Sequence, residues 1–139
     1  MLDLTQKKDV HIDERLRSNI IVWFTTVRTD GRPHSVAVWF LWDGSQILIF
    51  SQPNKQKLRN LQHNPHVVLA LDDTKNGGDV IVIEGKVELI DNAEVNTTLP
   101  AYAEKYTPLL NEMGWSPESM AADYSQAIRV TPTKFMTVS

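Results

Sequence analysis

Residues 50–65 read FSQPNKQKLRNLQHNP, and the rest of the chain is best understood outward from this stretch. An apolar run ends at Ser51, a Pro-Asn pair predicts a turn, and a short basic helix should follow. Lys55, Lys57 and Arg59 bring three cations close together. The free backbone N–H groups at a helix N-terminus attract anions, and nearby cations reinforce this preference. The stretch therefore fits a phosphate site, and from the residues alone it fits a solvated surface helix equally well.

Short runs rich in β-branched and aromatic residues lie on both sides of this stretch and predict strands. The Asp-Gly pairs at 30–31 and 43–44 predict two tight turns, so the first three strands should form an antiparallel meander. Gly85 interrupts a long run and predicts a bulge or a bend at a barrel corner. The last run should be a strand pair that is broken around Pro132. The expected strands are 20–27, 34–42, 46–51, 66–73, 80–90 and 127–139.

Helices are expected at 54–63 and in three further segments. Residues 9–18 predict a short helix, and residues 91–113 predict two short helices, because this segment opens with an Asp-x-x-Glu capping box and contains two prolines. Ser116, followed by proline, should cap a helix that runs to about Tyr124. Six or seven antiparallel strands with inserted helices predict a small closed barrel, with a sandwich as the alternative. Closure is favoured because it leaves no long apolar strand edge.

Composition limits the classes of function. At 139 residues, with 42% hydrophobic and 22% charged residues, the chain 1–139 should be a single domain. The net charge of −3 argues against nucleic-acid binding. No apolar run is long enough to span a membrane, and the N-terminus lacks the features of a signal peptide, so we expect a cytoplasmic protein. The absence of cysteine excludes disulfides, cysteine-ligated zinc and thiol catalysis.

The sequence contains none of the familiar catalytic motifs: it has no HExxH, GxSxG, P-loop or GxGxxG pattern. His63 and His66 flank an Asn-Pro pair that should end a helix, so they are not expected to share a helical face, and we predict no metal site. An anion-attracting helix start without an evident acid, base or nucleophile fits an enzyme whose reactive centre is a cofactor. It also fits a binding module.

Three stretches, taken in order, resemble the pyridoxamine 5'-phosphate oxidase-like flavin-binding split-barrel family. They are TTVRTDGRPHSVAVWFLWDG, ILIFSQPNKQKLRNLQHNPHVVLAL and VIVIEGKVELI. Within the family the chain is most similar to the short subgroup labelled as deazaflavin (coenzyme F-420)-dependent oxidoreductases, and the resemblance covers about residues 14–135. It implies a mainly β fold with inserted helices, a six-stranded antiparallel split β-barrel. It also implies a homodimer with two cofactor sites at the subunit interface.

The resemblance also implies site residues. Residues 36–39 match the strand whose backbone lies along the flavin ring, and Ser51 and Lys57 match the family's phosphate contacts. Gln56 stands where the oxidases carry an arginine, so one phosphate partner is missing, and Lys55 or Arg59 could replace it. The implied cofactor-binding residues are Val36, Ala37, Val38, Trp39, Ser51, Gln56, Lys57 and Arg59.

The implied function is an oxidoreductase that transfers hydride between a bound cofactor and a small molecule. FMN is the expected cofactor, and a deazaflavin of the F-420 type is the alternative. Ser35 and Phe40 stand where the oxidases carry an arginine and a lysine, so we do not expect oxidation of pyridoxamine 5'-phosphate, and we assign no catalytic residue. A non-catalytic flavin- or haem-binding carrier is the second hypothesis.

Overall fold

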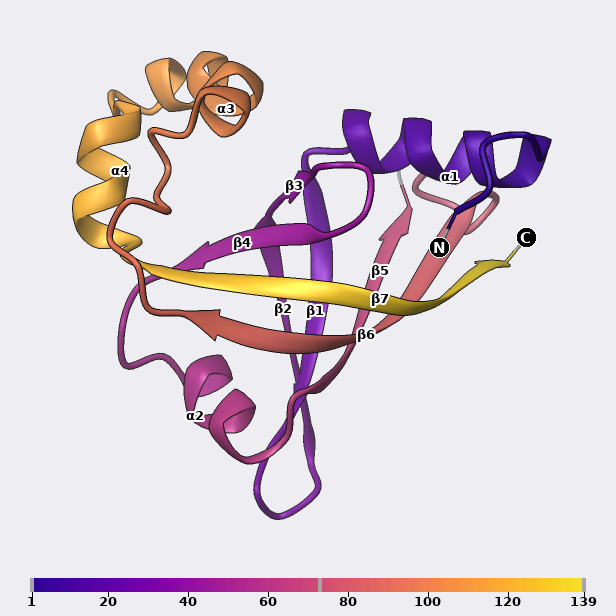
Figure 1. Ribbon diagram of the computed structural model, residues 1–139, viewed down its shortest axis with the longest axis horizontal. Coiled ribbons are helices and arrows are strands. Elements are labelled where there is room, and N and C mark those ends of the chain that lie inside the picture. Colours follow the sequence, from indigo (N-terminus) through magenta and orange to yellow (C-terminus); the bar gives the residue numbers. More distant parts are fainter. Residues whose placement is uncertain (1, 73, 139) are drawn as a thin grey trace.

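The computed structural model describes residues 2–72 and 74–138, and these residues form one curled antiparallel sheet with four helices around it (Figure 1). The strands are β1 (Ile21–Val27), β2 (Pro33–Trp39), β3 (Leu41–Trp42), β4 (Ile47–Ser51), β5 (His66–Asp72), β6 (Val80–Ile90) and β7 (Gln126–Val138). The helices are α1 (Lys7–Ser18), α2 (Gln56–His63), α3 (Pro100–Glu112) and α4 (Pro117–Asp123). The predicted mainly β split barrel with inserted helices is confirmed.

The sheet has the strand order β2-β1-β5-β6-β7-β4-β3, so its two edge strands follow each other in the chain. They are separated by Phe40, a fully buried residue at which the chain passes from one edge of the sheet to the other. The run 34–42 is therefore two strands, and the described sheet has seven strands, not six. The expected three-strand meander is wrong at this point, because β4 pairs with β3 and β7 and not with β2.

Strands β6 and β7 form the longest pairing, and it contains the bulge that Gly85 predicted. The register shifts between Glu84 and Gly85, which leaves Thr133 as an extra residue on β7. A Cβ on Gly85 would lie 2.7 Å from a methyl carbon of Val130, so only glycine allows this close approach. The expected break around Pro132 is wrong: the proline lies at the bulge, where it needs no ladder hydrogen bond, and β7 continues.

The helix predictions were partly correct. Ser116 caps α4 and exchanges capping-box hydrogen bonds with Ser119, as expected in part from the sequence. Residues 91–113 contain the single helix α3 instead of two, because Pro108 lies on an exposed position where an unpaired carbonyl can meet water. The capping box expected at 91–94 is absent, and the Asn92 side chain instead accepts a hydrogen bond within a turn. Helix α1 begins two residues earlier than predicted.

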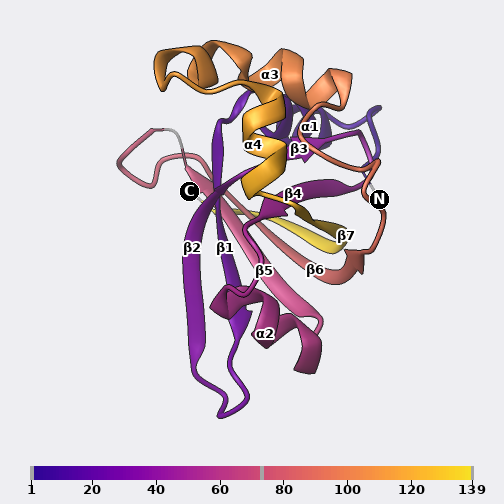
Figure 2. The same ribbon diagram turned by 90° about the vertical axis from the view of Figure 1, so that its left-hand side faces the viewer.

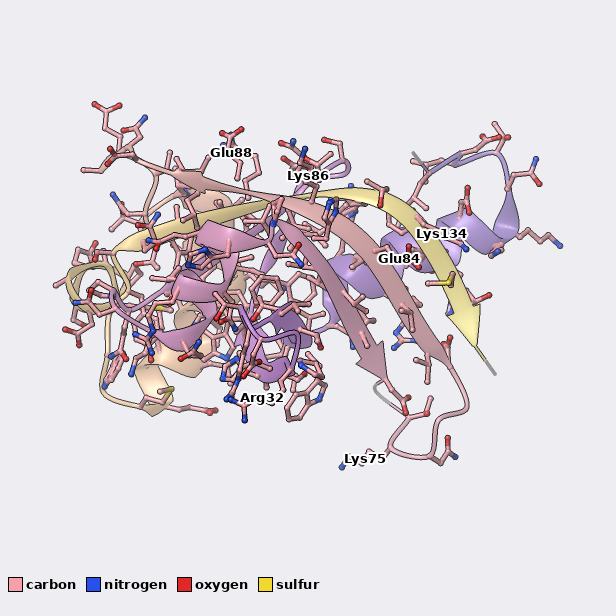
Figure 3. The ribbon with its side chains drawn as sticks, turned by 90° about the horizontal axis from the view of Figure 1, so that it is seen from below. Arg32, Lys75, Glu84, Lys86, Glu88 and Lys134 are labelled. Carbon is pink, nitrogen blue, oxygen red and sulfur yellow. The ribbon has the colours of Figure 1, made fainter. Side chains whose placement is uncertain are left out.

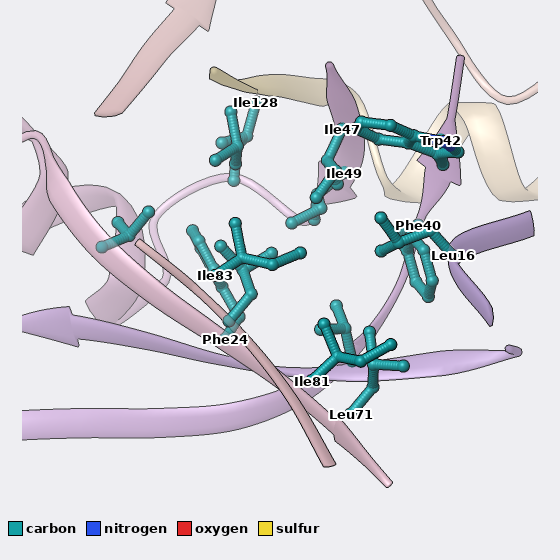
Figure 4. Close-up of a cluster of buried hydrophobic side chains, with 14 of the residues drawn as sticks. Leu16, Phe24, Phe40, Trp42, Ile47, Ile49, Leu71, Ile81, Ile83 and Ile128 are labelled. Carbon is teal, nitrogen blue, oxygen red and sulfur yellow. The ribbon is translucent and has the colours of Figure 1, made fainter. Parts of the chain in front are cut away.

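Two apolar clusters make up the core. The first fills the barrel with strand residues and covers one end with α1, as Figure 4 shows for Leu16, Phe24, Phe40, Trp42 and Ile83. The second lies between the strands and the pair α3–α4, which Figure 2 shows above the barrel. Its buried members are Phe50, Tyr102, Tyr106, Leu110, Met120 and Ala127.

Candidate functional site

A cavity of about 340 Å³ is lined by residues from β2, α2 and α4, among other parts of the chain. This volume lies at the lower end of the range for small-molecule sites, roughly 300 to 1,000 Å³. Four parts of the chain contribute to the cavity wall: β2, the end of β4, the start of α2 and the α3–α4 segment. The lining residues are Val36, Ala37, Val38, Trp39, Phe50, Gln52, Lys55, Lys57, Met113, Trp115, Met120 and Tyr124.

The β2 wall presents a strand edge to the cavity. Side chains alternate between the two faces of a strand, yet all four consecutive residues 36–39 line the cavity. Because residues from both faces of the strand line the cavity, the cavity borders the edge of β2 and not one of its faces. β2 pairs with β1 on one side, and no strand of the described part of the chain pairs with it on the other. Its backbone N–H and C=O groups are therefore available to a ligand along this edge.

The start of α2 contributes positive charge to the cavity. Lys55 is the N-cap residue, no side chain caps the helix, and its first turn holds no acidic residue. Lys57 lies half-buried two residues further along, in the first turn of the helix, and burial together with the charge of Lys55 lowers the pKa of its ammonium group. Two cations beside free helix N–H groups, with no carboxylate among the described lining residues, favour an anion.

The structure brings together five of the eight residues that sequence reasoning proposed: residues 36–39 and Lys57 all line the cavity. Ser51, Gln56 and Arg59 do not. The Ser51 hydroxyl is buried and donates to the carbonyl of Gln52 at 2.8 Å. The Arg59 guanidinium donates to the Gln56 side chain at 2.9 Å and to a backbone carbonyl of the preceding turn. A cofactor contact by these three residues stays a prediction.

No residue of the third wall, which the α3–α4 segment forms, is among the site residues proposed from the sequence. Met113, Trp115, Met120 and Tyr124 reach the cavity from a segment more than sixty residues after β2. Only the tertiary packing of the second core cluster places them there. A local signal was present, because a glycine followed by Trp-Ser-Pro marks a helix end and a helix start in direct succession.

The four histidines lie away from this cavity, since none of them is among the described lining residues. His11, on α1, has its Nε2 atom 2.7 Å from a carboxylate oxygen of Asp79. Across residues 2–72 and 74–138, no group of three or more histidine or acidic side chains is placed to hold a metal ion. None of the helices in this part of the chain has the length and hydrophobicity needed to cross a membrane.

Comparisons with known proteins agree with this architecture. Residues 9–139 match the family described as pyridoxamine 5'-phosphate oxidase. The chain is similar to the structure of an F-420 reductase, with 27% sequence identity, a TM-score of 0.66, and coverage of 89% of this chain and 94% of that one. It also shares its fold with the haem-storage protein HutZ from Vibrio cholerae (14% identity, TM-score 0.66, 93% of each chain covered). General Stress Protein 26 from Bacillus anthracis is a further structural neighbour (18% identity, TM-score 0.63, 92% and 94% covered). A search of curated protein sequences gives no match.

Proposed function

Because the chain belongs to the pyridoxamine 5'-phosphate oxidase family, we propose that its cavity binds a flavin-type cofactor and that the protein is an oxidoreductase acting on a small molecule. FMN is the cofactor that we expect, and a deazaflavin of the F-420 type is the alternative. One observation carries the proposal: the uncapped start of α2, with its two lysines, opens onto the same cavity as the free edge of β2.

The cavity matches the two chemically different ends of such a cofactor. A phosphate group would be held by Lys57 and Lys55 and by the first backbone N–H groups of α2, through charge-assisted hydrogen bonds. A flat ring with hydrogen-bonding heteroatoms would lie along the β2 edge, where backbone donors and acceptors alternate. When bound, a flavin or deazaflavin supplies the hydride-transfer chemistry. The chain's own contribution is to hold and orient the cofactor and to shield it from water.

The side chains of the site support a role in positioning and not in acid–base chemistry. The described lining residues include no aspartate, glutamate or histidine, and their titratable side chains are Lys55, Lys57 and Tyr124. With the two lysines assigned to the phosphate, we expect water to supply the proton for the substrate. Phe40, at a position where the oxidases carry a charged residue, is fully buried in the barrel. It therefore cannot contact a phosphorylated substrate, which agrees with the expectation that pyridoxamine 5'-phosphate is not oxidised.

A homodimer with its sites at the interface is part of the proposal, and an exposed apolar face supports it. Trp23, Ile21 and Val68 are large apolar residues on β1 and β5, and their exposed fractions are 52%, 42% and 39%. The cross-strand neighbour of Trp23 is Ala37, which lines the cavity. A second subunit that covered this apolar face would therefore also reach the edge of the cavity.

The outer face of β6 and β7 differs in character. Figure 3 shows acidic and basic side chains along these strands, including Glu84 and Lys134, which are cross-strand partners. Opposite charges in directly facing positions suit a solvated surface. The apolar character is thus concentrated on β1 and β5, where the proposed partner would sit.

The direct test is the visible absorption spectrum of the purified protein, followed by titration with FMN, F-420 and haem. We expect bound flavin, or saturable binding of FMN or F-420. A protein that binds neither flavin nor deazaflavin would contradict the proposal. Haem binding instead of flavin binding would favour the carrier hypothesis.

The phosphate end is tested by Lys57→Ala. Loss of a charged hydrogen bond should weaken cofactor affinity roughly ten- to a hundredfold. Lys86→Ala is the matched control, because Lys86 is an exposed lysine on β6 outside the cavity. If Lys57→Ala binds the cofactor as tightly as the wild type, the phosphate lies elsewhere.

A further inference from the structure

The α3–α4 segment gives the cavity a third wall whose chemistry differs from the other two. It contributes two thioether and two aromatic side chains, those of Met113, Met120, Trp115 and Tyr124, and no charged group. Trp115 and Tyr124 face each other at 6.2 Å between ring centroids with an interplanar angle of 53°. Aromatic and thioether groups pack well against a flat ring.

The backbone around Trp115 is fixed in place from both sides. Gly114 adopts a positive φ of 74°, and the Trp115 and Gly114 N–H groups bond to the carbonyls of Leu110 and Asn111. This is the Schellman arrangement that ends a helix. The next residue, Ser116, opens α4 with a capping box. A backbone held between two such motifs loses little further freedom when a ligand binds, so the backbone of this wall is preorganised.

Neither the indole N–H of Trp115 nor the hydroxyl of Tyr124 donates a hydrogen bond to another described residue, and both side chains are partly exposed, so each can donate to water or to a ligand. An uncharged ligand with one or two oxygen or nitrogen acceptors could satisfy them. A charged ligand would gain nothing at this wall, because both cations of the cavity lie at the start of α2.

We propose that the α3–α4 wall is the substrate subsite and that it takes a planar, uncharged aromatic molecule bearing a hydrogen-bond acceptor. The proposal rests on the proposed function, in which the phosphate and ring of the cofactor occupy the α2 and β2 walls. It names the class of substrate, and Trp115 is the residue whose ring favours planar molecules over non-planar ones.

The test is calorimetric titration of the FMN-loaded protein with 2-naphthol and with decahydro-2-naphthol, its saturated and non-planar analogue. Wild-type protein should bind 2-naphthol about threefold to tenfold more tightly, as expected for aromatic packing. Trp115→Leu should lose about tenfold in 2-naphthol affinity and keep its FMN affinity, and Lys57→Ala should do the reverse. Trp115→Phe, which keeps a ring, should be intermediate, and circular dichroism checks that each variant is folded.

Equal affinity for the planar and saturated probes would overturn the proposal, and so would a Trp115→Leu variant with unchanged 2-naphthol binding. A parallel loss of FMN and 2-naphthol affinity in Trp115→Leu would also overturn it, because the cofactor ring would then occupy this wall. A protein that binds 2-naphthol through Trp115 but never binds flavin would refute the proposed function and leave the aromatic subsite standing.

Discussion

Two fully buried tyrosines on the same helix offer a matched comparison of what a buried hydroxyl contributes. The Tyr106 hydroxyl accepts from the Phe40 N–H at 2.8 Å and lies 2.7 Å from the Ile20 carbonyl oxygen, to which it can donate. The Tyr102 hydroxyl is equally buried but has no hydrogen-bond partner in the described residues. Burial raises the pKa of both phenols, so both stay protonated at neutral pH.

Tyr106→Phe should therefore destabilise the protein, and Tyr102→Phe should not. In Tyr106→Phe the Phe40 N–H remains buried without an acceptor, and such a group costs about 1–3 kcal/mol. The Tyr106 hydroxyl also contacts the Phe40 carbonyl, which keeps the Lys105 ammonium as a donor at 2.9 Å when the hydroxyl is removed. The loss of stability should therefore be about 2 kcal/mol. Tyr102→Phe removes a buried hydroxyl that has no partner, so it should leave the stability unchanged or raise it.

Equilibrium unfolding in urea measures both values, and thermal melting should show the same ranking, with roughly 3–5 °C per kcal/mol at this chain length. The prediction is a difference between two identical chemical changes on one helix, so general effects of losing a phenol oxygen cancel. Equal destabilisation of the two variants would show that the hydrogen bonds to Phe40 do not account for the loss of stability. A larger loss for Tyr102→Phe would reverse the reasoning altogether.

Two further predictions concern a buried lysine and the exposed face. Burial lowers the pKa of Lys105 to about 8 from 10.5, so between these values the unfolded chain binds a proton that the folded chain lacks, and stability should rise with pH. Because the lysine is only half-buried, the free energy of unfolding should rise by about 1–2 kcal/mol. Urea unfolding at pH 7.5 and 10 should show this rise in the wild type and not in Lys105→Met. A rise that persists in Lys105→Met would show that other groups cause it. Trp23→Lys should make the proposed dimer monomeric in light scattering and weaken FMN binding, whereas Lys134→Met, on the charged face, should do neither. A dimer that survives Trp23→Lys would place the interface elsewhere.

Much of the barrel could be predicted from sequence because its signals are local. β-branched runs between Asp-Gly turns marked most of the strands, and β6 was predicted with the observed bounds, 80–90. The cap at Ser116 and the bulge at Gly85 could also be predicted, because in each case the residue type determines the local backbone structure. The resemblance to the family added residues 36–39 and Lys57 of the cavity.

The missed features all depend on contacts between distant parts of the chain. Residues 36–42 are continuously apolar, so nothing in them shows where one sheet edge ends and the other begins. That point is set by α3, because the backbone of Phe40 bonds to Tyr106 and Lys105 instead of to another strand. The wall around Trp115 was not among the predicted site residues for the same reason, since its place in the cavity depends on the packing of α3 and α4.

Through these contacts α3 determines the positions of two walls of the cavity. Trp39, at the end of the β2 wall, stacks on Tyr106 with 4.5 Å between ring centroids and an interplanar angle of 4°. The same helix ends in the motif that positions Trp115. A substitution in α3 can therefore change the distance between the ring-binding edge and the aromatic wall while the barrel pairings stay intact. It follows that, if the proposed sites are correct, substrate preference should be more sensitive to changes in α3 than to changes of similar size in the barrel strands.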